Sequence, residues 1–330
     1  MATSALAFSP KEFTCLIISD ATNAGTSGIH SSNMHQLDVD SVGYPSLNVT
    51  QALDVRSGAG HTFKDEDFFQ DNTMRVVELS LSGTMHNDTG HNLLLQNICN
   101  DVSGDAAIAT GHTGTSQKYG AAVTNAASSL TLIIQPSDVS NQRGLEFPGM
   151  VVTNFAITSD AGTEGGRYKF SATLQSGVKP DLASTAAAGS NAYANTTDVV
   201  LSTGSGFKVM NSDVVLNSFT CTIDHPAVFS GVTSTGYEVV SRGAECAVTV
   251  DCQVKYDAET KTLVHGYDTQ ASHNGTNSFV ITNNNAYGVA IDNAVYTNVA
   301  YSESDIMMLD ISIKSVDDGT DALVTFDITS

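Results

Sequence analysis

The stretch PGMVVTNFAITSDAGTEGGRYKFSATLQSG, residues 148–177, decides the expected fold. It predicts two strands joined by a glycine-rich turn, because apolar residues recur at every second position in each arm. In the first arm Val151, Phe155 and Ile157 fall on one side. In the second arm, Tyr168 and the apolar residues that follow it alternate with four polar residues: Lys169, Ser171, Thr173 and Gln175. The turn at 160–166 contains the glycines that a hairpin loop needs for positive φ. The stretch therefore predicts a β-hairpin with one covered face and one polar face.

The rest of the chain favours strands as well. Ser, Thr, Asn, Gly and Val are abundant, a composition typical of β-strands and turns. Short helices are expected over 91–102, with Asp88 or Thr89 as the cap, and over 257–268. Further strands are expected at 75–83, 129–136, 213–223, 246–256, 278–283, 287–300, 306–316 and 321–329. These patterns predict a mainly β protein with few short helices.

The order of these elements suggests an internal duplication. A strand, a helix and three strands follow one another over 75–176, and the same series recurs over 246–316. The hypothesis depends on order and spacing, with little residue identity between the halves. It divides the chain into an N-terminal arm with a first domain at 1–178, a linker or crossing loop at 179–204, and a second domain at 205–330.

The charge of the chain excludes several kinds of partner. Lys and Arg number 14 and Asp and Glu 35, for a formal charge of −21. Without a basic patch, binding to nucleic-acid phosphates or to an anionic membrane is not expected. The sequence has no run of eighteen apolar residues and no recognisable secretory signal, so we expect no membrane span and synthesis in the host cytoplasm. Five scattered cysteines without a CxxC motif predict reduced thiols.

No motif predicts catalysis, a cofactor or a metal. Glycine-rich nucleotide-binding loops do not occur. His86 and His91 could share a metal, but the NDTG between them favours a solvated turn. His112 could serve as a base, but no nucleophile signature accompanies it. A calcium-like loop beginning at Asp38 lacks the later oxygen ligands. We therefore predict a protein that is not an enzyme.

Several phrases together carry a resemblance to a known family. They are SLTLII, FPGMVVTNFAIT, YKFSATLQSG, VVLNSFTCTI and CQVKYDAETKTLVHG, within a two-half pattern that covers roughly residues 60–330. The chain resembles the major tail tube proteins of long-tailed, siphovirus-like bacteriophages, in the form with a duplicated tube domain. The resemblance implies two similar antiparallel β-sandwich or barrel domains, each with one flanking helix. It also implies that they contribute strands to a β-barrel shared between subunits.

The same resemblance implies a function in the virion. Trimeric, pseudo-hexameric rings would stack into a hollow tube that conducts DNA to the host without binding it specifically. The partners would be further copies of the chain and the tail-tip, tape-measure and tail-terminator proteins. A net negative charge would keep DNA from binding to the wall of such a tube, although an acidic chain is also favoured for solubility alone. Candidates for the lumen face are Lys169, Ser171, Thr173 and Gln175.

Contact between rings is expected from the loop at 103–128, which has no periodicity, and then from the arm at 1–34. Candidate contact residues are Asp105, His112, Lys118 and Tyr119. The alternative for both segments is a flexible surface. Other structural β-proteins share this composition, namely a tail-tip ring subunit, a capsid decoration protein or a surface-layer protein. A β-sandwich hydrolase or sugar-binding module is a weaker alternative, because the chain has no Trp.

Overall fold

The structure is a computed structural model. It describes residues 13–19, 34–43, 50–53, 68–71, 77–99, 115–117, 129–136, 143–178, 180–185, 190–191, 199–201, 206–232, 237–242, 246–269, 278–281, 288–303, 305–317 and 323–327. The prediction of a mainly β protein with few short helices is confirmed. Its described α-helices are α1 (Thr89–Cys99) and α2 (Lys261–Asp268).

The long strand β9 (Arg143–Asp160) organises the fold. Its first part pairs with β8 (Leu130–Pro136) and β11 (Asp181–Thr185). Its second part pairs with β10 (Lys169–Ser176) and β15 (Leu216–Asp224). Between the two parts Gly149 adopts a φ of 65°, a conformation that glycine permits and that lets the strand pass from one layer to the other.

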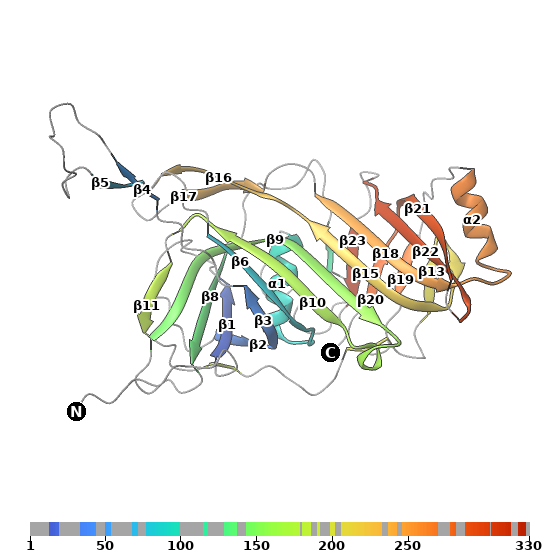
Figure 1. Ribbon diagram of the computed structural model, residues 1–330, viewed down its shortest axis with the longest axis horizontal. Coiled ribbons are helices and arrows are strands. Elements are labelled where there is room, and N and C mark those ends of the chain that lie inside the picture. Colours follow the sequence, from blue (N-terminus) through green and yellow to red (C-terminus); the bar gives the residue numbers. More distant parts are fainter. Residues whose placement is uncertain are drawn as a thin grey trace.

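An antiparallel sheet of eight strands runs the length of the molecule (Figure 1). The first half contributes β3 (Val39–Gly43), β6 (Val77–Thr84), β10 and β9, in that spatial order. The second half continues it with β15, β18 (Ala247–Lys255), β22 (Met307–Ser315) and β21 (Ala294–Glu303). We call this sheet the long sheet.

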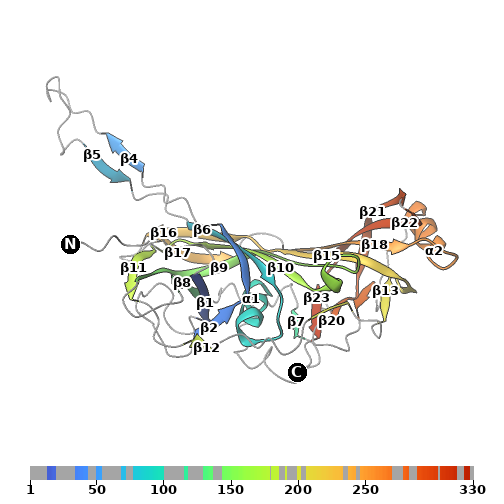
Figure 2. The same cartoon turned by 60° about the horizontal axis from the view of Figure 1, so that its bottom comes forward.

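A second layer covers one face of the long sheet (Figure 2). In the first half it pairs β2 (Met34–Leu37), β1 (Phe13–Ser19), β8, the start of β9 and β11, and β12 (Ser190–Asn191) joins β2. In the second half it pairs β14 (Ser212–Asp213), β13 (Phe207–Val209), β19 (Phe279–Ile281), β20 (Gly288–Ile291), β23 (Val324–Asp327) and β7 (Thr115–Gln117). Apolar side chains of both halves form one buried cluster between the layers.

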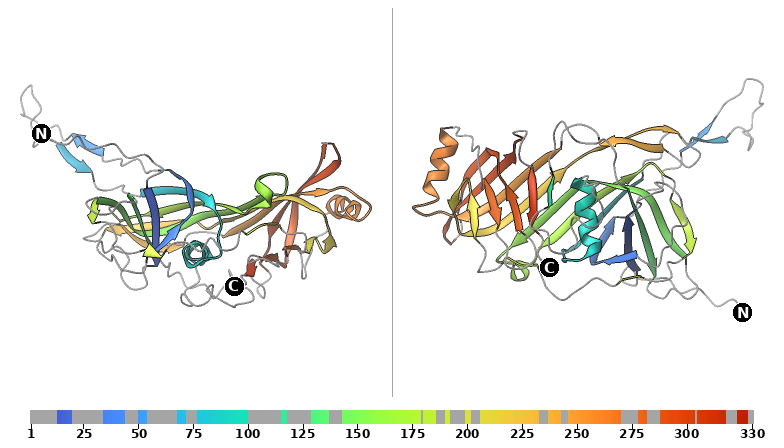
Figure 3. Two further views of the ribbon diagram at one scale, coloured as in Figure 1. Left: turned by 90° about the horizontal axis from the view of Figure 1, so that it is seen from below. Right: turned by 180° about the vertical axis from the view of Figure 1, so that it is seen from behind.

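Each helix packs against the equivalent strand of its half, α1 against β9 and α2 against β21. Helix α1 lies in the second layer of the first half, where nearly all of its residues are buried, whereas α2 lies at the far end of the molecule (Figure 3). Two hairpins extend the sheets. One, β16 (Ala227–Val232) and β17 (Tyr237–Arg242), prolongs β15 and β18. The other, β4 (Thr50–Leu53) and β5 (Phe68–Asp71), lies apart from the body (Figure 1).

The two halves repeat one arrangement of strands. In the long sheet β3, β6, β10 and β9 correspond to β15, β18, β22 and β21, and in the second layer β2, β1 and β8 correspond to β14, β13 and β19. The β-bulges in the strand pairing also occur at equivalent positions in the two halves. The register skips Thr153 in β9 and Thr297 in β21, and it skips Asp40 in β3 and Asn217 in β15. β-Bulges are specific features of a strand, so their coincidence fixes the residue-by-residue equivalence of the halves.

A hydrogen bond at the strand ends agrees with that equivalence. The backbone N–H of Met85 donates to the carbonyl of Tyr168, and that of Tyr256 donates to the carbonyl of Met307. The aligned strands share the pattern V-x-T-N-x-A, at 151–156 and at 295–300. This shared pattern is sequence evidence for the repeat, in addition to the order of the elements.

Three details differ from the sequence expectations. The bulge at Thr153 turns Val152, rather than Val151, towards the apolar cluster, although both are buried. The segment 179–204, expected to be a linker, contains β11 and β12, which pair with strands of the first half. The loop at 103–128 contains β7, which pairs with β23 of the second half.

Candidate assembly surface

The outer face of the long sheet carries the four predicted polar residues. In β10, Phe170, Ala172 and Leu174 are buried, while Lys169, Ser171, Thr173 and Gln175 point to the other face. The expected alternation is therefore confirmed. That this face borders a lumen stays a prediction.

Short polar side chains continue across this face from strand to strand. The pairing registers define one row from β6 to β21, which consists of Thr84, Lys169, Thr158, Thr220, Asp251, Ser312 and Asn298. A neighbouring row consists of Ser82, Ser171, Ala156, Thr222, Thr249, Lys314 and Val295. Hydroxyl groups are the commonest side chains in both rows, so these two rows are polar and carry few charges.

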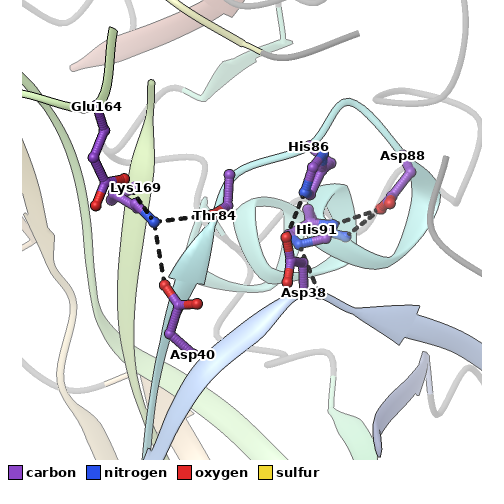
Figure 4. A network of polar contacts seen from close by, with 8 residues as sticks. All are labelled: Asp38, Asp40, Thr84, His86, Asp88, His91, Glu164 and Lys169. Atoms are coloured by element: carbon purple, nitrogen blue, oxygen red, sulfur yellow. Dashed lines mark hydrogen bonds and ion pairs between the residues drawn. The ribbon is translucent and has the colours of Figure 1, made fainter. Parts of the chain in front are cut away.

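The lysine at the start of the first row is held by two carboxylates (Figure 4). The ammonium of Lys169 lies 3.2 Å from Oδ2 of Asp40 and 3.1 Å from Oε2 of Glu164. It also donates a hydrogen bond of 3.1 Å to Oγ1 of Thr84. Partial burial lowers the pKa of Lys169, but the bonds to Glu164 and Asp40 outweigh it and raise the pKa above its usual value. Two nearby carboxylates therefore neutralise this cation.

The two halves join edge to edge between β9 and β15. Seven residue pairs connect these strands, from Asp160–Ser218 to Asn154–Asp224. Beyond the Asp160–Ser218 pair, the N–H of Ala161 donates to the carbonyl of Asn217 at 2.8 Å. We call this contact the internal junction.

At its two opposite edges, the long sheet has no further partner strand among the described residues, and we call these edges open. Among the described strands, β3 pairs with β6 alone, and β21 pairs with β22 alone. By the repeat, β21 is the equivalent of β9, and β3 is the equivalent of β15. The two open edges are thus the equivalents of the two edges that meet in the internal junction.

A buried histidine network lies beside the open edge β3 (Figure 4). His86 is 2% exposed and His91 is fully buried, so the prediction of a solvated turn is wrong. The reason is that this turn leads into α1, which packs inside the second layer. Nε2 of His86 lies 2.7 Å from Oδ2 of Asp38, and this hydrogen bond lowers the pKa of Asp38. The network therefore connects the residue that precedes β3 to the start of α1.

The hydrogen bonds of His91 define its tautomer. Oδ1 of Asp88 accepts the backbone N–H of His91 at 2.9 Å, which confirms Asp88 as a helix cap. The same oxygen lies 2.7 Å from Nδ1 of His91, so Nδ1 carries the proton. Nε2 then accepts the backbone N–H of Asp38 at 3.3 Å. A neutral His91 satisfies both partners, and a structural role explains the pair better than a metal site.

Other candidate sites find no support in the described part of the chain. Within the described ranges, no group of three or more His, Cys, Asp or Glu is placed to hold a metal ion. Neither described helix is long and apolar enough to cross a membrane. The candidate ring-contact residues Asp105, His112, Lys118 and Tyr119 lie outside the described residues, as does most of the arm at 1–34, apart from β1. Nothing in the sequence indicated that Asp38 and Asp40 would be the partners of His86 and Lys169, because they come from a distant part of the chain, whereas Glu164 lies in the turn just before Lys169.

Comparison with known proteins identifies no relative. No protein-family model matches the chain, and no curated protein matches it. The function must therefore be argued from the geometry of the long sheet.

Proposed function

We propose that this protein is a structural virion subunit that assembles with copies of itself into closed rings, which stack into the tail tube of a long-tailed bacteriophage. The observation that carries the proposal is the internal junction between β9 and β15. Its two edges recur, open, as β21 and β3 at the ends of the same sheet. An open edge is a template for another strand, so the edges β3 and β21 can each accept a strand of a partner.

The repeat gives the register of the contact between copies. Thr158 pairs with Thr220 in the internal junction, and their equivalents are Ser302 in β21 and Gly43 in β3. Strand β21 of one copy would therefore pair antiparallel with β3 of the next, placing Ser302 opposite Gly43. The contact is head-to-tail, so it would close into a ring if the rotation between copies divides a full turn evenly.

Closure into a ring gives a barrel wide enough to be hollow. Three copies, the number that the resemblance implies, would contribute eight strands each. With strands about 4.8 Å apart and tilted by about 40°, such a barrel measures about 48 Å between opposite backbones. Barrels with more than about sixteen strands enclose an open channel rather than a packed core. Closure also removes both open edges.

The outer face of the long sheet would then line the channel. Its rows of hydroxyl groups carry few positive charges that would attract phosphates, and Lys169 already forms ion pairs with Asp40 and Glu164. The net charge of −21 further opposes counterion-release binding. DNA would pass without specific binding. Stacked rings would end at tail-tip and terminator proteins and surround the tape-measure protein.

Engineered disulfides test the proposed register. Cysteines at Ser302 and Gly43 should link separate copies upon mild oxidation. A non-reducing gel should then show a series of linked species, the largest of which contains as many chains as one ring. A Cβ at Gly43 meets only the rotatable hydroxyl of Ser80 closely. Cys15, Cys221 and Cys252 interfere little, because burial raises the pKa of each thiol to about 12. Cys246 is only half-buried, so it is replaced by Ser in every variant.

Matched variants make the result interpretable. Cysteines at Thr158 and Thr220, the internal equivalents, should link within one chain at every concentration. Cysteines at Ser302 and Val39, about four residues out of register, should not link. Single chains with no ladder in the Ser302/Gly43 variant, when the internal pair links, would refute edge pairing. Electron microscopy of the linked rings separates a tube subunit, which stacks, from a tail-tip subunit, which forms a single ring.

A further inference from the structure

Three large side chains form an incompletely buried group beside the open edge β21. Tyr301 is 54% exposed, Met307 is 47% exposed and Tyr256 is half-buried. The rings of Tyr256 and Tyr301 lie 5.6 Å apart, and the N–H of Tyr256 donates to the carbonyl of Met307 at 3.0 Å. Tyr301 pairs with Leu309, which is fully buried, so the group lies on the face that the second layer covers elsewhere. We call these three residues the edge patch.

The equivalents of the edge patch in the first half are completely buried. The strand pairings fix the equivalence, because they align one row of three residues with another: Thr84, Lys169 and Thr158 with Lys255, Met308 and Ser302. Counting one position from each row makes Met85, Tyr168 and Ile157 the equivalents of Tyr256, Met307 and Tyr301. Met85 is fully buried, and Tyr168 and Ile157 are each 1% exposed. The same three places in the repeat therefore differ in burial.

The internal junction explains part of this difference. Phe219 of β15 lies across β9 from the first half, and its ring meets that of Tyr168 at 5.4 Å between centroids. Phe219 and Ile157 belong to the same buried cluster. Tyr168 also donates its backbone N–H to Val199, so Phe219 supplies a share of its burial rather than all of it. In the first half, an apolar side chain from the adjoining edge strand thus completes the core.

The equivalent of Phe219 is Val42 in the open edge β3. Phe219 faces Cys252 of β18 and Val42 faces Leu81 of β6, and these partners are themselves equivalent. Val42 is half-buried and packs against the apolar cluster from the rim of the sheet. An apolar residue therefore stands at the place on β3 from which Phe219 reaches across the internal junction.

We propose that Val42 of the neighbouring copy covers the edge patch, so that the apolar core continues from one copy into the next. The inference rests on the edge pairing proposed above. With Ser302 opposite Gly43, Val42 lies opposite Glu303 and diagonal to Tyr301. Diagonal neighbours in an antiparallel pair are about 7–8 Å apart, which is within reach of an aromatic ring. Tyr and Met are also residue types enriched in the cores of interfaces between proteins.

The edge patch should therefore contribute much of the affinity between copies. Tyr301→Ala should weaken their association by about tenfold or more, as expected when an aromatic anchor in an interface is truncated. Tyr301→Phe keeps the ring and should keep the association. Asn298→Ala is the matched control, because Asn298 is exposed in the same strand but points to the outer face, and it should leave the association unchanged.

The test measures how fast copies are linked through cysteines at Ser302 and Gly43 during mild oxidation. We expect Tyr301→Ala to slow this linkage by about tenfold or more, and Tyr301→Phe and Asn298→Ala to leave its rate unchanged. Val42→Ala should slow it as well. If the two side chains meet across copies, the variant with both changes should be slowed by less than the product of the two single effects. Cysteines at Thr158 and Thr220 report on folding, since they link within one chain.

The outcomes separate this inference from the proposed function. Slower linkage with Tyr301→Ala, together with a non-additive effect of Val42→Ala, supports it. Linkage that Tyr301→Ala leaves unchanged overturns the inference, keeps edge pairing intact and assigns the edge patch to a partner other than a copy. Independent effects of the two changes overturn Val42 as the covering residue. Equal slowing of the internal pair would assign Tyr301 to the fold of its own chain and overturn the inference too. If copies with the native edge patch never link while the internal pair does, edge pairing is refuted and the inference with it.

Discussion

Phe219 tests whether the two halves share one core. It lies in β15 at the internal junction, is 2% exposed, and belongs to the cluster that spans both halves. Its ring meets Tyr168 of the first half at 5.4 Å between centroids and Phe279 of the second half at 6.1 Å. Phe219→Ala removes a fully buried aromatic side chain, which costs about 3–5 kcal/mol in a core that relaxes only in part. The two lost ring contacts place the change in the upper part of that range.

The assay is urea unfolding followed by circular dichroism on the unassembled chain. We expect one transition in the wild type, and the same single transition shifted to lower urea in the variant, with the slope unchanged. Val215→Ala is the control. Val215 is 58% exposed, so truncating its side chain should change the free energy of unfolding by about 0.5 kcal/mol or less. Two separate transitions in the wild type, or a cost below about 1 kcal/mol for Phe219→Ala, would refute a shared core.

Three further predictions concern the bulge, the buried network and the outer face. The side chain of Asn97 accepts the N–H of Val152 at 2.7 Å beside the bulge, so Asn97→Ala should lower the free energy of unfolding by about 1–3 kcal/mol in the same urea assay. The pKa of Asp38 is lowered from 3.8 mainly by its hydrogen bond to His86, so its stabilisation is complete above pH 3.8 and disappears as pH falls through the folded-state pKa. The stability difference between wild type and Asp38→Asn should therefore be constant near neutral pH and shrink in acid, and a difference that grows in acid would contradict this sign. Thr220→Lys with Thr222→Lys should give assembled rings a salt-dependent affinity for duplex DNA in a filter-binding assay, whereas wild-type rings should retain none.

The sequence predicted the parts of the fold that depend on local periodicity. The alternation in β10 and the apolar run of β8 depend on nearest neighbours along the chain, and both strands form where expected. Helix α1 also forms, with Asp88 as its cap. The bulge at Thr153 was not predictable from period 2, because it depends on the register that β10 imposes across the sheet.

Long-range partners explain most of what the sequence did not reveal. The burial of His86 and His91 follows from the packing of α1 beneath β3, some fifty residues earlier in the chain. The sequence predicted Lys169 on the polar face. Its ion pair with Asp40 forms only because the edge strand β3 pairs with β6, which lies beside β10. The sequence also did not predict which strands lie at the edges of the long sheet, because a strand's sequence does not show how many neighbouring strands it pairs with.

The repeat also explains why a duplicated chain suits ring assembly. The proposed ring of three copies would contain six equivalent junctions, of which three are the internal contacts between β9 and β15. A covalent connection makes each internal contact intramolecular, with an effective concentration in the millimolar range for a short linker. Only the three contacts between β21 and β3 then cost association entropy. Because the internal junction forms in every chain, it holds the long sheet in one piece and keeps its two open edges at a fixed separation. In the proposed assembly, the concentration at which rings form would therefore be set by the contact between β21 and β3, and not by the internal junction.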